Sequence, residues 1–168
     1  KWDYETTSCD SSVMTGSSTL YSELIHSYDK TDSTLVQWRG ELPTWNHDGI
    51  YHAAWSAASI GSGTYSVGVH HPGGSWQRIS FGTVLSGDLC APDFLTWDNP
   101  IQWSDGTIEG GSSGSGLFRN YDRKFIGIAS CGSVDPCATT VYAGYGEMNK
   151  SYSPAYGGWY NYLIRGED

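Results

Sequence analysis

The sequence has few basic residues, no long apolar run and no C-x-x-C pair, and each absence excludes a class of protein. Nine Lys and Arg against 18 Asp and Glu give a net charge of −9. A nucleic-acid interface needs clustered cations, so none is expected. No stretch approaches the roughly 20 apolar residues that cross a bilayer, and no membrane partner is expected. The cysteine spacing does not match a zinc site, and we expect no metal or cofactor.

Convincing helical periodicity is also absent, whereas turn residues and aromatic residues are abundant. The chain contains 22 Gly, 12 Tyr and 8 Trp, a composition that favours strands joined by tight turns. Pro43 and Gly49 interrupt the strand pattern and predict a connection between two lobes. The end of the chain, residues 157–164, could form a short helix. Short apolar runs bounded by turn residues predict strands at 34–38, 65–69, 125–129 and 139–142.

The chain contains four cysteines, Cys9, Cys90, Cys131 and Cys137. Together with the low lysine content they indicate an oxidising compartment and a secreted, extracellular protein. Four cysteines allow three internal pairings, and the sequence does not choose among them. The first residues already alternate as in a strand, which suggests that the chain is a fragment or a processed product.

One glycine- and serine-rich stretch, TIEGGSSGSGLF at residues 107–118, is the strongest candidate for chemistry. Such a stretch could be a flexible linker. However, strand-like apolar residues follow it directly at Leu117 and Phe118, and Glu109 lies within it. Glycines around a nucleophilic serine let the backbone turn sharply and present N–H groups to an oxyanion. The stretch therefore indicates a nucleophile loop.

Two other segments complete a possible catalytic set. Asp32 precedes the predicted strand 34–38, where an aspartate either closes a turn or orients a histidine. Ser130-Cys131-Gly132 follows the predicted strand 125–129. Extended backbone at this place can pair with a substrate chain as an added strand, or it can simply end in a turn.

Together and in this order, these pieces resemble the chymotrypsin-type serine proteases, most closely their lysyl endopeptidase branch. The resemblance implies an all-β fold of two six-stranded antiparallel barrels, the first incomplete, with a short C-terminal helix. Residues 1–48 would form the last part of the first barrel, and residues 49–168 the second barrel and the helix. Further landmarks of the branch run along almost the whole chain: KWDY with Cys9, AAWS at 53–56, VHHPG at 69–73, RIS at 78–80, FLTW at 94–97 and IQW at 101–103.

The resemblance also implies roles for individual residues. Ser113 would be the nucleophile, and Asp32 the aspartate that orients the histidine of a Ser-His-Asp triad. The amides of Gly111 and Ser113 would form the oxyanion hole. The substrate would contact the other positions that match the family: Thr107, Ser130, Cys131, Gly132, Gly146 and the aromatic Trp97.

Two departures from the family bear on activation and specificity. Most members carry an aspartate directly before the nucleophile, which pairs with a new amino terminus on activation. Ser112 occupies that position here, as in the lysyl branch, so this switch should not operate. Lysyl endopeptidases pair the substrate lysine with an aspartate, and Ala143 aligns with it. An unpaired lysine ammonium would be costly to bury, so an uncharged P1 residue is expected.

The general base is missing from this pattern. The family supplies a histidine from a Thr-Ala-His-Cys-like block located before the residues that match Lys1. None of the five histidines has that context: His26, His47, His52, His70 and His71. One explanation is an N-terminal fragment of the same precursor, linked by disulfides through Cys9 and Cys137. The other is an inactive homologue that acts as a binding or structural protein.

The sequence therefore predicts a serine endopeptidase that cleaves polypeptides through an acyl-enzyme on Ser113. A carbohydrate-binding module is a third interpretation, suggested by tryptophans such as Trp45, Trp76 and Trp159. Aromatic faces do stack on sugars, but most tryptophans of a small barrel belong to its core.

Overall fold

The computed structural model describes residues 21–39, 53–90, 98–133, 138 and 140–163. The chain is mostly β, as the sequence predicted. In the described residues, no helix is long and apolar enough to span a bilayer. The strands are β1 (Tyr21–Tyr28), β2 (Ser33–Arg39), β3 (Tyr65–His70), β4 (Arg78–Val84), β5 (Asp98–Asp105), β6 (Gly116–Arg119), β7 (Phe125–Gly132) and β8 (Tyr142–Glu147). The helical elements are η1 (Asp29–Thr31), η2 (Pro72–Gly74), α1 (Met148–Tyr152) and η3 (Trp159–Asn161).

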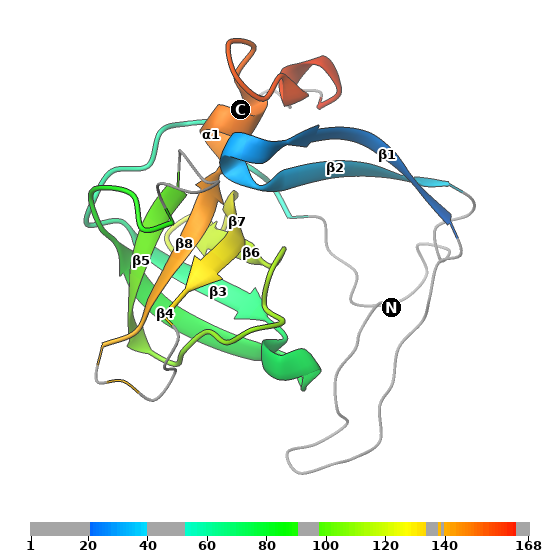
Figure 1. Cartoon of the computed structure of the whole chain (residues 1–168). Helices are drawn as coiled ribbons and strands as arrows, with labels where there is room; N and C mark the ends of the chain where they lie inside the picture. Colours follow the sequence, from blue (N-terminus) through cyan, green and yellow to red (C-terminus); the bar gives the residue numbers. More distant parts are fainter. Residues whose placement is uncertain (1–20, 40–52, 91–97, 134–137, 139, 164–168) are drawn as a thin grey trace.

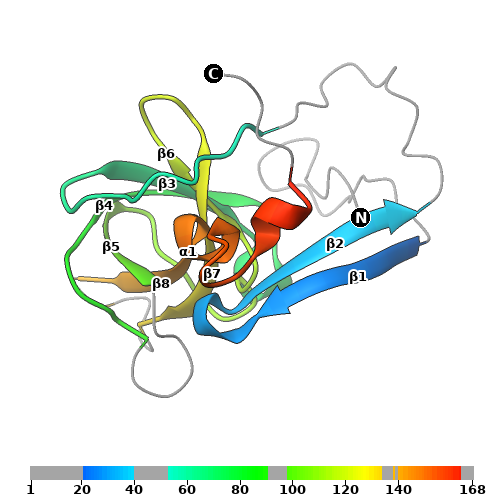
Figure 2. The same ribbon diagram turned by 90° about the horizontal axis from the view of Figure 1, so that it is seen from above.

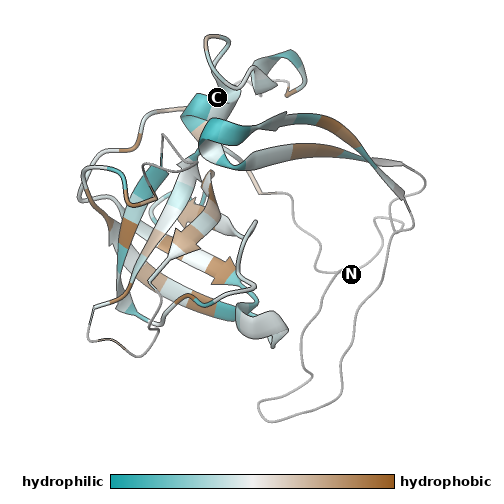
Figure 3. Ribbon diagram, in the orientation of Figure 1, coloured by the Kyte–Doolittle hydropathy of each residue, from teal (hydrophilic) through white to brown (hydrophobic). Residues whose placement is uncertain are grey.

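Six strands form a closed antiparallel barrel in the order β3-β4-β5-β8-β7-β6 (Figure 1). Alternate side chains of each strand point inward, so the barrel interior collects the apolar residues. Figure 3 shows these apolar positions as brown bands along the barrel strands. The buried core consists of Val84, Ile101, Trp103, Ile108, Leu117, Ile126, Ala129, Val141, Ala143 and Tyr145.

The remaining two strands form an antiparallel hairpin, β1–β2, that extends away from the barrel (Figures 1 and 2). Leu24 and Val36 lie opposite each other in this hairpin and are 63% and 42% exposed. This pair forms an apolar patch on the hairpin that no described residue covers fully. The expected lobe boundary near residue 48 lies outside the described residues.

The turn end of the hairpin is fixed against the barrel. The hydroxyl groups of Thr31, Ser33 and Ser151 form a buried triangle with Oγ–Oγ distances of 2.8–3.0 Å. Gly146 of β8 allows the close approach, because a Cβ there would lie 1.8 Å from the carbonyl oxygen of Thr31. Figures 1 and 2 both show this end of the hairpin beside α1 and β8. The contact sets the position of Asp32, the next residue.

Most of the predicted strands are confirmed, and one is wrong in position. Residues 34–38, 65–69 and 125–129 lie within β2, β3 and β7, but β8 begins only at Tyr142. The α-helix lies at Met148–Tyr152, earlier than expected, while residues 157–164 contain the 3-10 turn η3. Trp159 in that turn is 4% exposed, which places it in the interior rather than on a sugar-binding surface.

The cysteine pairing that the sequence left open is settled for two of the four residues. Cys90 and Cys131 form a disulfide across 41 residues of sequence. A bridge over a loop of this length restricts the unfolded chain and stabilises the fold by up to about 4 kcal/mol. Because Cys131 is in β7, the bridge ties the segment after β4 to that strand. Cys9 and Cys137 lie outside the described residues.

Candidate active site

The glycine- and serine-rich stretch is an ordered turn, not a linker. Gly111 and Gly114 have φ values of +91° and +81°, which glycine adopts without strain. The amide of Ser112 donates to the carbonyl of Glu109 at 3.1 Å, and the amide of Gly114 donates to that of Ala129 at 2.8 Å. Ser113 is at the tip of this turn with its side chain exposed, while Ser112 beside it is buried. The backbone thus presents Ser113 to solvent.

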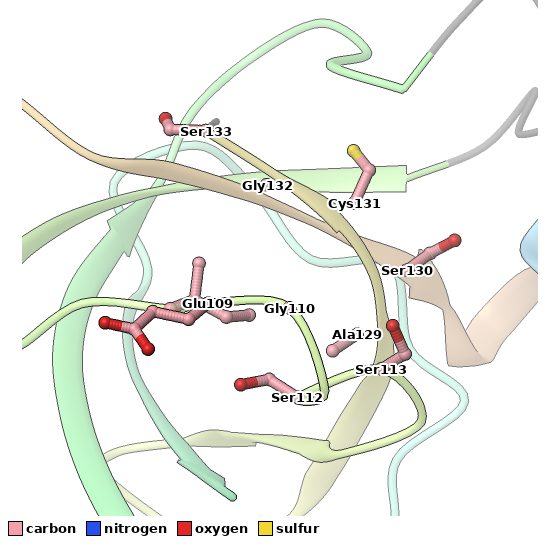
Figure 4. A pocket seen from close by; sticks show the side chains of 10 residues that line it. Glu109, Gly110, Ser112, Ser113, Ala129, Ser130, Cys131, Gly132 and Ser133 are labelled. Carbon is pink, nitrogen blue, oxygen red and sulfur yellow. The ribbon is translucent and has the colours of Figure 1, made fainter. Parts of the chain in front are cut away.

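A cavity of about 320 Å³ opens beside Ser113 (Figure 4). One wall is the serine loop and the other is the end of β7. Thr107 and Gly146, which the sequence placed at the pocket, are not among the lining residues. Trp97 lies outside the described residues. The lining consists of Ile108, Glu109, Gly110, Ser112, Ser113, Ala129, Ser130, Cys131, Gly132 and Ser133.

The structure brings Asp32 to this cavity. Asp32 follows η1 with a left-handed φ of +45° and has an exposed side chain. Its Oδ2 accepts a hydrogen bond of 2.5 Å from the hydroxyl of Ser130. Figure 4 shows Ser130 next to Ser113 on the cavity wall. Asp32 therefore lies, through its contact with Ser130, at the cavity that Ser113 lines, although Asp32 and Ser113 are 81 positions apart in sequence.

The end of β7 offers free backbone along the cavity. Its pairing with β6 ends at Gly116 opposite Ile128. Beyond that point Ala129 makes two bonds to the serine loop: its amide donates to the carbonyl of Ser115, and its carbonyl accepts from the amide of Gly114. The serine loop then turns away, so residues 130–132 face the cavity on that side. On their other side, Cys131 and Gly132 pair with Gly144 and Ala143 of β8. An extended peptide can add to such an edge as another strand.

A buried histidine lies under the serine loop, which sequence reasoning did not identify as part of the site. His70, at the end of β3, is 1% exposed. Its Nδ1 lies 3.0 Å from the Oγ of Ser112, and its Nε2 lies 3.0 Å from the Oγ of Ser80. The Ser80 hydroxyl in turn donates to the carbonyl of Thr107 at 2.7 Å. The HHP landmark marked this position in the sequence, but nothing there indicated its partners.

Burial lowers the pKa of His70, and the nearby His71 adds to the effect while Glu109 opposes it. With both ring nitrogens engaged in the interior, His70 is not placed as the base for Ser113. His26 faces the ring of Tyr162 at 5.8 Å, and the Nδ1 of His71 lies 3.0 Å from the carbonyl of Ser75. His47 and His52 lie outside the described residues.

The lowered pKa of His70 predicts a loss of stability in mild acid. The unfolded chain binds the proton near pH 6.5 and the folded chain only at lower pH. Protonation therefore favours unfolding as the pH falls from about 6.5 to the folded pKa, by at most about 1.4 kcal/mol per pH unit. The free energy of unfolding from urea titrations between pH 7 and 5 should decline more steeply for the wild type than for His70→Gln.

The matched control for this measurement is His71→Gln, because His71 is adjacent in sequence but only half-buried. The control should retain most of the wild-type slope, because it removes only the smaller contribution of His71 and leaves the burial of His70 in place. Parallel curves for the wild type and His70→Gln would show that His70 titrates alike in both states, contrary to the burial argument.

The sequence and the fold match known proteases. Residues 1–147 match the family model described as lysyl endopeptidase, C-terminal domain. The lysyl endopeptidase of Pseudomonas aeruginosa is 32% identical over 121 residues, which are 69% of this chain and 25% of that protein. The chain thus spans only a quarter of the length of this curated relative.

Solved structures share the fold at lower identity. The HtrA-type protease AlgW with a tripeptide superposes with a TM-score of 0.54 at 18% identity, over 82% of this chain and 44% of that one. A glutamic-acid-specific serine protease superposes with a TM-score of 0.50 at 20% identity, over 77% and 67%. The barrel has a chymotrypsin-like fold, and the chain belongs to the lysyl endopeptidase C-terminal domain family.

Proposed function

We propose that this chain carries the nucleophile, the oxyanion hole and the orienting aspartate of a secreted serine endopeptidase. The observation that carries the proposal is the hydrogen bond from Ser130 to Asp32, because it brings the carboxylate to the cavity that Ser113 lines. Membership of an endopeptidase family supports the same function. The base is a histidine that lies between Asp32 and Ser113 in the complete protein.

The reaction follows from these positions. The histidine removes the proton from the Ser113 hydroxyl as its oxygen attacks the scissile carbonyl carbon. The resulting oxyanion accepts hydrogen bonds from the amides of Gly111 and Ser113. The intermediate collapses to an acyl-enzyme as the histidine gives its proton to the leaving amine. Water then attacks the ester with the same base, which frees Ser113 and the acid product.

We further propose that the substrate lies extended along residues 130–132 with an uncharged P1 side chain in the cavity. Ala143, which aligns with the lysine-binding aspartate, is fully buried in the barrel core and does not line the cavity. Among the described lining residues Glu109 is the one acid, and it is exposed. A lysine ammonium in the cavity would therefore lose hydration without a buried partner.

Because none of the histidines in the described residues is placed as this base, we infer that a further segment of the precursor carries it. The exposed pair Leu24 and Val36 gives that segment an apolar surface on which to complete the first barrel. We propose that Cys9 and Cys137 link the two parts through disulfides. The Cys90–Cys131 bridge supports an oxidising, extracellular location.

Covalent labelling of the full-length protein tests this function. A fluorophosphonate should modify Ser113, found by mass spectrometry of the labelled peptide, and Ser113→Ala should abolish the label. Ser133→Ala, which removes another hydroxyl from the cavity wall, should retain it. A label on another residue, or no label on a folded protein, would contradict the protease and leave the non-catalytic homologue.

A further inference from the structure

The segment after β3 packs directly against the loop that carries Ser113. The amide of Gly73 in η2 donates a hydrogen bond of 2.7 Å to the carbonyl oxygen of Gly110. A Cβ on Gly111 would lie 3.1 Å from the nitrogen of Gly74 and 3.2 Å from that of Gly73. The two backbones are therefore in contact, with no side chain between them.

This bond determines where the amide of Gly111 points. The carbonyl of Gly110 and the N–H of Gly111 belong to one planar trans peptide, so they point in opposite directions. Because the carbonyl points to Gly73, the N–H points to the other face of the loop. Turning this peptide over would break the bond to Gly73 and remove one donor from the oxyanion hole.

The hydroxyl groups around His70 fix the same loop at both ends. Ser80 uses its one proton on the carbonyl of Thr107, so it can only accept from His70, whose Nε2 must carry the hydrogen. The Nδ1 of the neutral ring is then an acceptor, and Ser112 donates to it. The chain of donors thus runs from Ser112 through His70 and Ser80 to Thr107.

The three side chains that form this chain of donors are engaged and shielded from water. Ser112, His70 and Ser80 are each no more than 2% exposed. Breaking one link leaves a buried polar group unsatisfied, which costs more than the net value of a hydrogen bond. The loop between Thr107 and Ser112 is therefore bridged through one histidine, while Gly73 holds its middle at Gly110.

We propose, on the basis of the protease function above, that His70 and Gly73 are positioning residues that preform the oxyanion hole by holding residues 110–113 in place. The interactions that hold the loop are hydrogen bonds between uncharged groups within residues 70–113. An aspartate at position 112 would need a cation as its partner, whereas Ser112 is satisfied by a neutral ring. The amide of Gly111 is consequently in its working orientation without an inserted amino terminus.

Ser112→Ala and Ser80→Ala in the full-length protein test this role. Each removes one hydroxyl from the chain of donors, and both leave the side chain of Ser113 unchanged. Deleting an oxyanion donor lowers kcat by about 10²–10³-fold, so loosening one should lower it by about 10- to 100-fold with KM within about twofold. Ser66→Ala is the matched control. Ser66 is fully buried in β3, the strand that carries His70, but its hydroxyl donates to the carbonyl of Thr64 and is not part of the chain of donors.

Three readouts separate positioning from a merely structural role. The Ki of a substrate-like peptide aldehyde, whose carbonyl carbon bonds to Ser113 and whose oxygen enters the oxyanion hole, should rise by the same factor as kcat falls. The amide of Gly73 should exchange with solvent faster in Ser112→Ala than in the wild type. Nitrogen-15 spectra should show His70 as the neutral Nε2–H tautomer.

The outcomes are distinct. The role of His70 would be overturned if folded Ser112→Ala kept the wild-type kcat, or if KM rose while kcat did not fall. It would also be overturned if the unfolded fraction of the variant accounted for all of its lost activity. An Nδ1–H tautomer would do the same. If the wild type itself fails to label at Ser113, the proposed protease function fails first. If the wild type is labelled and active but Ser112→Ala and Ser80→Ala have the same kcat as it does, only the positioning role is refuted.

Discussion

Replacing Asp32 by Asn is expected to lower kcat of the full-length protein about 10⁴-fold with little change in KM. The amide keeps the shape of the carboxylate but loses its charge and presents N–H groups, so it favours the wrong tautomer of the catalytic histidine. Asp32 is exposed at the turn end of the hairpin and makes its described contact with Ser130, so the substitution should leave the fold intact. Steady-state kinetics on a peptide with an uncharged P1 residue measures the loss.

Two further variants calibrate this effect. Ser130→Ala removes the donor to Asp32 but leaves the charge, and a lost hydrogen bond to a charged group corresponds to about 10- to 100-fold in rate. Asp105→Asn, an exposed change at the end of β5, should have no effect. If Asp32→Asn keeps more than a tenth of the wild-type kcat, Asp32 does not orient the catalytic histidine, and another residue must do so.

Replacing Gly146 by Ala is expected to lower kcat/KM by about 10²-fold or more, although residue 146 is not at the cavity. The new Cβ would lie 1.8 Å from the carbonyl oxygen of Thr31, where contacts below 3.0 Å are not tolerated. The backbone sets the position of both atoms, so no side-chain rotation relieves the clash and β8 and the hairpin must separate by more than 1 Å. A misplacement of about 1 Å can cost about 10²-fold in rate, and here it moves Asp32 relative to Ser113.

Amide exchange distinguishes this displacement from general unfolding. Strands β1 and β2 should exchange faster in Gly146→Ala, while the barrel strands β3, β4 and β6 retain protection. Gly61→Ala is the matched control, because a Cβ there meets nothing within 4 Å. Wild-type activity in Gly146→Ala would mean that the hairpin tolerates the shift and that Gly146 does not set the position of Asp32.

The sequence was most informative where chemistry and local pattern coincide. Strands β2, β3 and β7 followed from apolar runs between turn residues, because inward-facing side chains need that alternation. The loop around Ser113 followed from its glycines, two of which adopt positive φ. The start of β8 was misplaced because Thr140 and Val141 are good strand formers, although pairing begins only at Tyr142 with β5 and at Ala143 with β7.

The long-range parts of the site could not be read from the sequence. Nothing local shows that Ser130 donates to Asp32, since the two residues are 98 positions apart. The partners of His70 come from β4 and the serine loop, and Ser112, which is 42 positions from His70 in the sequence, becomes its neighbour only in the folded barrel. The Cys90–Cys131 pairing likewise depends on the path of the folded chain. The position of Gly146 beside Thr31 required the docked hairpin.

The unequal lengths of β6 and β7 have a consequence for solubility. A closed barrel leaves no strand edge on which another molecule could polymerise, which protects the barrel from edge-to-edge aggregation. Here β6 has four residues and β7 has eight, so the end of β7 extends beyond β6 and has no neighbouring strand on that side. The resulting edge is short, as edges that avoid aggregation are, and under the proposed function it docks a few residues of peptide. Lengthening β6 toward its amino end would be expected to close that opening.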